Sequence, residues 1–141
     1  MRRSALLLAC AATTYACSCA FLGNLHEAFC LSDYVTHAKV ASKSYSDDGT
    51  SINYIVEHMA VYRKPEDMFQ LPMTITSPSE LPACGVELDV EEEYLLGGKI
   101  LNDGSLLITS CGLMRKWDEF SRESKKALRT YTCKEEGPDD A

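Results

Sequence analysis

Hydrophobic and polar residues alternate along much of the middle of the chain, which is the pattern of β-strands with one buried face. The alternation is clearest over residues 52–62, and a skipped beat at Glu57-His58 indicates a β-bulge there. Similar patterns predict strands over residues 34–41, 69–76, 94–100 and 106–109. Polar turns with Asp48-Gly49 and with Asn102-Asp103-Gly104 separate neighbouring strands.

Helices are expected near both ends of this strand region. Asn24 is suited to cap a short helix that includes Cys30, with Glu27 as its capping-box partner. A second helix is expected over residues 121–131. Its region has six candidate buried positions: Leu113, Trp117, Phe120, Ala127, Leu128 and Tyr131. Five strands with flanking helices predict a mainly β domain, a small five-stranded barrel of the OB-fold type.

The first sixteen residues have the pattern of a secretory signal peptide. Arg2 and Arg3 precede a short apolar run over residues 5–12, and small residues before Cys17 offer a cleavage site. The apolar run is too short to span a bilayer, so no membrane partner is expected. We therefore predict a signal peptide at 1–16, one domain at 17–133, an acidic disordered tail at 134–141, and a secreted, extracellular protein.

Charge narrows the choice of partners. After removal of residues 1–16 the chain has 12 basic and 21 acidic residues, a formal net charge of −9. Binding to a phosphate backbone needs clustered Lys and Arg, so nucleic acid is not an expected partner. We expect a monomer.

Six cysteines remain in the mature chain: Cys17, Cys19, Cys30, Cys84, Cys111 and Cys133. In a secreted chain they indicate three disulfides, for which 15 pairings are possible. Three lie early and three late, so pairing the early set with the late set would fasten the N-terminal segment to the domain. Zinc binding is a competing interpretation, but Cys17-Ser18-Cys19 lacks the Cys-x2–4-Cys spacing of structural zinc sites.

Cys17 would become the first residue after cleavage, with a free α-amine whose ordinary pKa is about 7.7–8.0. The unprotonated amine and its own carbonyl oxygen form a five-membered-ring chelator for a metal with an open coordination position. The competing interpretation is a purely structural disulfide cysteine. No nucleophile elbow, zinc-protease helix or phosphate-binding loop is present, and His37 reads as a surface or hydrogen-bonded histidine. We expect neither enzymatic activity nor a cofactor.

Several motifs in order along the chain are similar to one family. They are Cys17-Ser18-Cys19, Ala28-Phe29-Cys30, Ala38-Lys39-Val40, Cys84-Gly85-Val86, Glu93-Tyr94-Leu95, Gly98-Lys99, Asp103-Gly104, Ile108-Thr109-x-Cys111, Trp117-Asp118 and Lys125-Lys126-x-Leu128. Together they resemble the N-terminal, netrin-like (NTR) domain of the tissue inhibitors of metalloproteinases (TIMPs), as in the one-domain relatives of invertebrates. Between Cys19 and Cys30 the chain departs from the family, because residues 20–26 lack its usual proline-rich run.

The resemblance implies three disulfides, Cys17–Cys84, Cys19–Cys111 and Cys30–Cys133. It also implies a secreted inhibitor of extracellular zinc metalloproteinases, in which the amine and carbonyl of Cys17 chelate the catalytic zinc of the target. The side chain of Ser18 would enter the adjacent specificity pocket. The implied protease-binding residues are Cys17, Ser18, Cys19, Ala20, Leu81, Pro82, Ala83 and Cys84. The alternative is a netrin-like protein-binding module without inhibitory activity.

Overall fold

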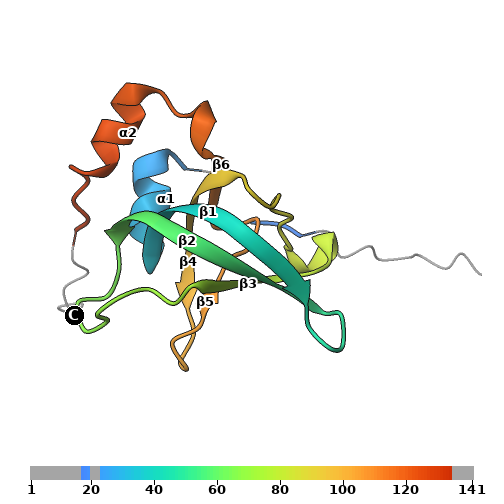
Figure 1. Cartoon of the computed structure of the whole chain (residues 1–141). Helices are drawn as coiled ribbons and strands as arrows, with labels where there is room; N and C mark the ends of the chain where they lie inside the picture. The colour runs from blue at the N-terminus through green and yellow to red at the C-terminus, as the bar shows by residue number, and fades with distance from the viewer. Residues whose placement is uncertain (1–16, 20–22, 135–141) are drawn as a thin grey trace, which may run out of the picture.

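The computed structural model describes residues 17–19 and 23–134. The predicted signal peptide, Ala20 and residues 135–141 of the predicted tail lie outside the described residues. The described chain forms a strand-rich body with helices at one end (Figure 1). No helix within the described residues is both long and apolar enough to cross a membrane.

Six strands and two α-helices make up the fold. The strands are β1 (Tyr34–Tyr45), β2 (Ser51–Arg63), β3 (Thr74–Pro78), β4 (Glu93–Ile100), β5 (Leu106–Leu107) and β6 (Leu113–Lys116). The α-helices are α1 (Leu25–Leu31) and α2 (Arg122–Leu128), and two 3-10 turns are η1 (Leu81–Ala83) and η2 (Trp117–Glu119). The Asn24 side chain accepts a hydrogen bond from the Glu27 N–H and so caps α1 as predicted.

Five of the strands close into a barrel in the order β1-β2-β3-β5-β4, and β4 pairs with β1 to complete the ring. All neighbours are antiparallel except β3 and β5, which are parallel. This confirms the predicted mainly β, five-stranded barrel. The pairing of β1 with β2 skips Met59, next to the predicted bulge at Glu57-His58.

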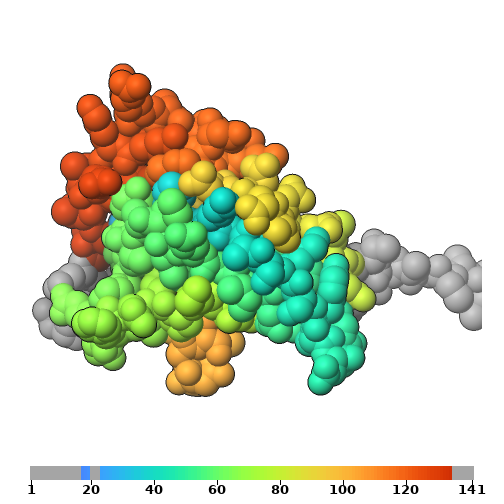
Figure 2. Space-filling model, in the orientation of Figure 1, coloured from blue at the N-terminus to red at the C-terminus, as the bar shows by residue number. Residues whose placement is uncertain are grey.

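The barrel interior holds the larger of two hydrophobic cores. Its fully buried side chains include Tyr34, Tyr54, Ile75, Leu96 and Leu106. Alternate residues of each strand point inward, and this produces the alternation of hydrophobic and polar residues in the sequence. The loops β1–β2 and β4–β5, teal and orange in Figure 2, project from this packed body.

The second core lies between the helices and the outer face of the barrel. Phe29 of α1 and Leu128 of α2 pack with Val35 and Leu95, whose side chains point outward from β1 and β4. Leu113 and Phe120 are buried here as predicted, whereas Trp117, Ala127 and Tyr131 are half-buried. Both helices therefore cover the same region of the barrel (Figure 1).

The structure differs from the predicted elements in several places. The strand expected from Phe69 begins at Thr74, because Pro72 has no N–H to donate and Phe69 is 93% exposed. The strand expected over 106–109 ends at Leu107, and the second helix ends at Leu128. Strand β6 was not predicted, since its two apolar residues are too few to show a period.

Candidate functional site

The N-terminal segment lies at the end of the barrel away from the two helices, beside η1 (Figure 1). Disulfides join Cys17 to Cys84 and Cys19 to Cys111, with Cα–Cα distances of 5.1 and 5.2 Å. A third, Cys30–Cys133, joins α1 to the segment after α2. The structure thus has the three pairs that the resemblance implied, each linking an early cysteine to a late one.

The first two disulfides pack against each other. The Cys111 Sγ atom lies 3.7 Å from Cys17 Sγ and 3.8 Å from Cys84 Sγ, and the Ser110 hydroxyl lies 3.3 Å from Cys17 Sγ. The three sulfur atoms fall within 4.8 Å of one another. Each is already bonded to another sulfur, so none is the thiolate that a zinc site requires. The geometry favours disulfides over the competing zinc interpretation.

The loop that carries η1 is fixed by its own backbone. The carbonyl of Glu80 accepts hydrogen bonds from the N–H groups of Ala83, at 3.1 Å, and Gly85, at 3.0 Å. Cys84 has a left-handed backbone, with φ 64° and ψ 33°, which is uncommon for a residue with a side chain. At Gly85 a Cβ would lie 2.3 Å from the carbonyl oxygen of Pro78, so only glycine fits without a shift.

Buried polar side chains hold the strand-like segment after Cys84. The Tyr54 hydroxyl donates to the Val86 carbonyl at 2.9 Å and accepts from the Leu88 N–H at 3.0 Å. Burial raises the pKa of Tyr54, which keeps the phenol protonated for this donation. The Ser77 hydroxyl, also buried, accepts from the Val86 N–H. Sequence reasoning assigned no role to Tyr54, Ser77 or Ser110, because polar pairing of this kind has no local sequence pattern.

The predicted contact residues that the structure describes lie together, and four of them face outward. Ser18 is exposed between the half-buried Cys17 and Cys19, and Leu81, Pro82 and Ala83 are all exposed on η1. Leu81 is 78% exposed, which is unusual for a leucine in a well-packed loop. Two disulfides and a constrained turn therefore fix a small surface made of N-terminal backbone and loop side chains. We call this surface, residues 17–19 and 81–84, the N-terminal edge.

The histidines have structural partners and form no catalytic group in the described part of the chain. The His37 Nε2–H group donates to the Glu93 carboxylate at 2.8 Å, and the ring stacks on Trp117 at a centroid distance of 3.7 Å. His58 donates to the Pro72 carbonyl, and His26 donates to the Thr132 carbonyl. The prediction that His37 is a hydrogen-bonded histidine is confirmed.

Comparison with known proteins gives a consistent match. Residues 15–135 match the family described as tissue inhibitor of metalloproteinase. The chain is 36% identical over 110 residues to a protein of Caenorhabditis elegans named putative metalloproteinase inhibitor tag-225, covering 72% of this chain and 69% of that one. It is 35% identical over 123 residues to human metalloproteinase inhibitor 2, covering 80% of this chain and 54% of that one.

The chain thus spans about half the length of the vertebrate inhibitor. Among solved structures, an excretory-secretory protein 2 of Ancylostoma ceylanicum is 19% identical, with a TM-score of 0.48, covering 74% of this chain and 85% of that one. The matched family consists of inhibitors rather than enzymes, which agrees with the expectation that this chain is not an enzyme.

Proposed function

Because the chain belongs to the tissue inhibitor of metalloproteinase family, we propose that it is a secreted inhibitor of extracellular zinc metalloproteinases. Its inhibitory group is the N-terminal edge, with the free α-amine and carbonyl of Cys17 as chelators of the target's catalytic zinc. The proposal includes cleavage after Ala16, since an amine within a peptide bond cannot bind a metal. The observation that carries it is the pair of disulfides that fixes Cys17 and Cys19 beside η1.

The chemistry follows from the open position of a catalytic zinc ion, which normally holds a water molecule. An α-amine with a pKa of about 7.7–8.0 is partly unprotonated near neutral pH, and its unprotonated form can bind a metal. Together with the carbonyl oxygen of the same residue it displaces that water, and with it the nucleophile of the protease. The inhibitor supplies no metal of its own.

Specificity in this proposal comes from the residues that flank the chelator. The exposed side chain of Ser18 enters the pocket beside the zinc, and Leu81, Pro82 and Ala83 extend the contact along the cleft. A hydroxymethyl side chain is small, so it accommodates pockets of different depth. Residues 17–19 and 81–84 are held in place before the protease binds. Less conformational entropy is therefore lost on binding, which supports tight association.

Competition with a small zinc chelator tests where the protein binds. We expect the correctly processed protein to inhibit matrix-type metalloproteinases and to be displaced by a hydroxamate that occupies the catalytic zinc. Removal of the zinc should also weaken binding, whereas added salt should have little effect. Equal binding to the hydroxamate-blocked enzyme, with a dependence on ionic strength, would favour the protein-binding module instead.

A further inference from the structure

Charge is distributed unevenly along the described chain. Residues 17–112 contain 5 basic and 14 acidic residues, a formal charge of −9, whereas residues 113–134 contain 7 basic and 3 acidic residues, a formal charge of +4. The positive segment comprises β6, η2, α2 and the residues just after them. An acidic protein therefore carries one basic region, at the end of the barrel covered by the helices.

Four of these basic residues share one side of α2. Arg122, Lys125, Lys126 and Arg129 follow the spacing i, i+3, i+4, i+7, which places them along a single helix face. Arg122, Lys126 and Arg129 are exposed and Lys125 is half-buried. The buried Leu128 anchors a different side of the helix in the second core. We call these four residues the α2 basic face.

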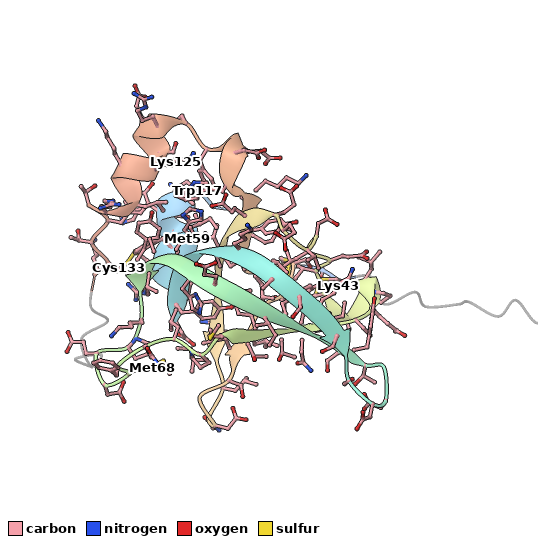
Figure 3. All side chains as sticks on the ribbon, viewed as in Figure 1. Lys43, Met59, Met68, Trp117, Lys125 and Cys133 are labelled. Carbon is pink, nitrogen blue, oxygen red and sulfur yellow. A yellow bond between two sulfur atoms is a disulfide. The ribbon has the colours of Figure 1, made fainter. Side chains whose placement is uncertain are left out.

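Among the described residues, no carboxylate forms a salt bridge with the basic side chains of this segment. The salt bridges found among the described residues involve His37, Lys39, Lys43 and Lys99, and none involves a basic residue after position 112. Lys125 instead has its Nζ atom 4.8 Å from the centre of the Trp117 ring. The two residues are labelled next to each other in Figure 3. The basic residues of the β-barrel are thus mostly paired, while those of α2 are available to an external anion.

Helix stability alone does not account for this arrangement. Lysine and arginine in the last turn interact favourably with the helix dipole, which suits Lys125, Lys126 and Arg129. Arg122 lies in the first turn, where a positive charge is unfavourable. A row of cations that runs the full length of the helix, about 10 Å, points to a ligand with repeated negative charges.

We propose that the α2 basic face binds a sulfated polysaccharide of the heparan sulfate class. Sulfate groups along such a chain accept charge-assisted hydrogen bonds from lysine and arginine, and each added contact strengthens the association. Three disulfides fit an extracellular environment, where these polysaccharides occur. An anionic membrane suits the helix less well, because its apolar side is already buried in the second core and cannot insert.

The proposed polysaccharide site and the N-terminal edge lie at opposite ends of the molecule (Figure 1). Polysaccharide bound to α2 therefore leaves the N-terminal edge free. This activity does not depend on protease inhibition, so each can be tested without the other.

Binding of the purified full chain to immobilised heparin tests the proposal. We expect retention at about 0.15 M NaCl and elution by added salt, as screening weakens exposed charge pairs. The affinity of the variant Arg122→Gln/Lys126→Gln/Arg129→Gln for heparin should fall by at least about tenfold. The matched variant Lys39→Gln/Lys43→Gln/Lys99→Gln loses the same net charge from salt-bridged positions and should lose less than about threefold. Circular dichroism of each variant establishes that it is folded.

Three results would overturn the proposal. The first is failure of the unmodified protein to bind heparin, and the second is an equal loss in both triple variants, which would indicate net charge rather than a site. The third is binding to fully desulfated heparin, or to vesicles with phosphatidylserine, that is as strong as binding to heparin. Inhibition of a metalloproteinase, measured in parallel with and without heparin, should be unchanged by the α2 substitutions.

Discussion

Gly85 is the residue on which the shape of the η1 loop depends most directly. Its missing side chain allows the carbonyl oxygens of Pro78 and Glu80 to approach to 2.3 and 2.8 Å from the place of a Cβ. Both are backbone atoms, so a methyl group there must displace the loop itself. The loop carries four of the proposed contact residues, Leu81, Pro82, Ala83 and Cys84.

Gly85→Ala is therefore expected to weaken inhibition by about tenfold or more, equivalent to about 1.4 kcal/mol, and to lower stability by about 1–3 kcal/mol. Inhibition constants and denaturant unfolding measure the two effects. Gly49→Ala is the matched control. An added Cβ at Gly49 meets no neighbouring atom, but the φ of +72° is unfavourable for alanine, so the substitution should cost about 1 kcal/mol of stability without moving η1. An equal loss of inhibition in both variants would contradict the proposed role of the loop.

Tyr54 links the barrel interior to the segment that follows η1. Tyr54→Phe leaves the Val86 carbonyl and the Leu88 N–H without their buried partner, so stability is expected to fall by about 2 kcal/mol. The exposed Tyr45, 58% accessible, is the control, and Tyr45→Phe should change stability by less than about 0.5 kcal/mol. Urea unfolding compares them, and similar values for the two variants would show that the Tyr54 hydroxyl is not the fixing group.

Among the elements, the β1–β2 turn has an acid-sensitive contact. The Asp48 carboxylate accepts hydrogen bonds from the Ser46 hydroxyl and from the N–H and hydroxyl of Thr50, and these lower its pKa to about 2. Because the folded pKa lies below the ordinary value of 3.8, the contribution to stability is present above about pH 4 and is lost as pH falls toward 2. NMR titration of the Asp48 carboxyl should give a midpoint of about 2; a midpoint near 4 would mean that the turn does not hold the carboxylate.

Two disulfides, Cys17–Cys84 and Cys19–Cys111, hold the N-terminal edge, whereas Cys30–Cys133 lies outside it. Loss of a disulfide should therefore lower inhibition only where that disulfide holds the N-terminal edge. Cys30–Cys133 and Cys17–Cys84 span 103 and 67 residues, so loss of either is expected to cost about 3–5 kcal/mol. The variant Cys30→Ser/Cys133→Ser should still inhibit when folded, since the N-terminal edge keeps both of its bridges.

The variant Cys17→Ser/Cys84→Ser keeps a backbone amine and carbonyl at position 17 but loses the bridge that fixes them. We expect its inhibition to fall at least about tenfold at a temperature where circular dichroism shows it folded. If both double variants inhibited equally, rigidity of the N-terminal edge would not be part of the mechanism.

Elements with long alternating patterns could be predicted, and those fixed by tertiary contacts could not. Strand β2 follows the period closely, and the cap of α1 follows from Asn24. Residues 69–73 also alternate, yet Leu71 is buried while Phe69 and Met73 are exposed. There the chain is held instead by the Val56 N–H, which donates to the Met73 carbonyl, and by His58. A hydrophobic pattern does not distinguish these contacts from strand pairing.

At the scale of the whole molecule, the N-terminal edge combines parts that are distant in the sequence. Cys17 and Ser18 were identifiable from their place after the predicted signal peptide, and Leu81–Ala83 from the family resemblance. Their support by Tyr54, Ser77 and Ser110 could not be predicted, because these residues meet only when the barrel closes. In the proposed mechanism, the closed barrel provides the rigid base and the N-terminal backbone provides the zinc-chelating groups.

The measurement that tests the central claim most directly compares two forms of the protein that differ by one residue. One begins at Cys17, as established by N-terminal sequencing, and the other carries a single alanine before Cys17. Both should fold alike, but the added residue converts the α-amine into an amide without a free lone pair. We predict that the first form inhibits a matrix-type metalloproteinase and the extended form does not. Equal inhibition by the two forms would contradict chelation by Cys17.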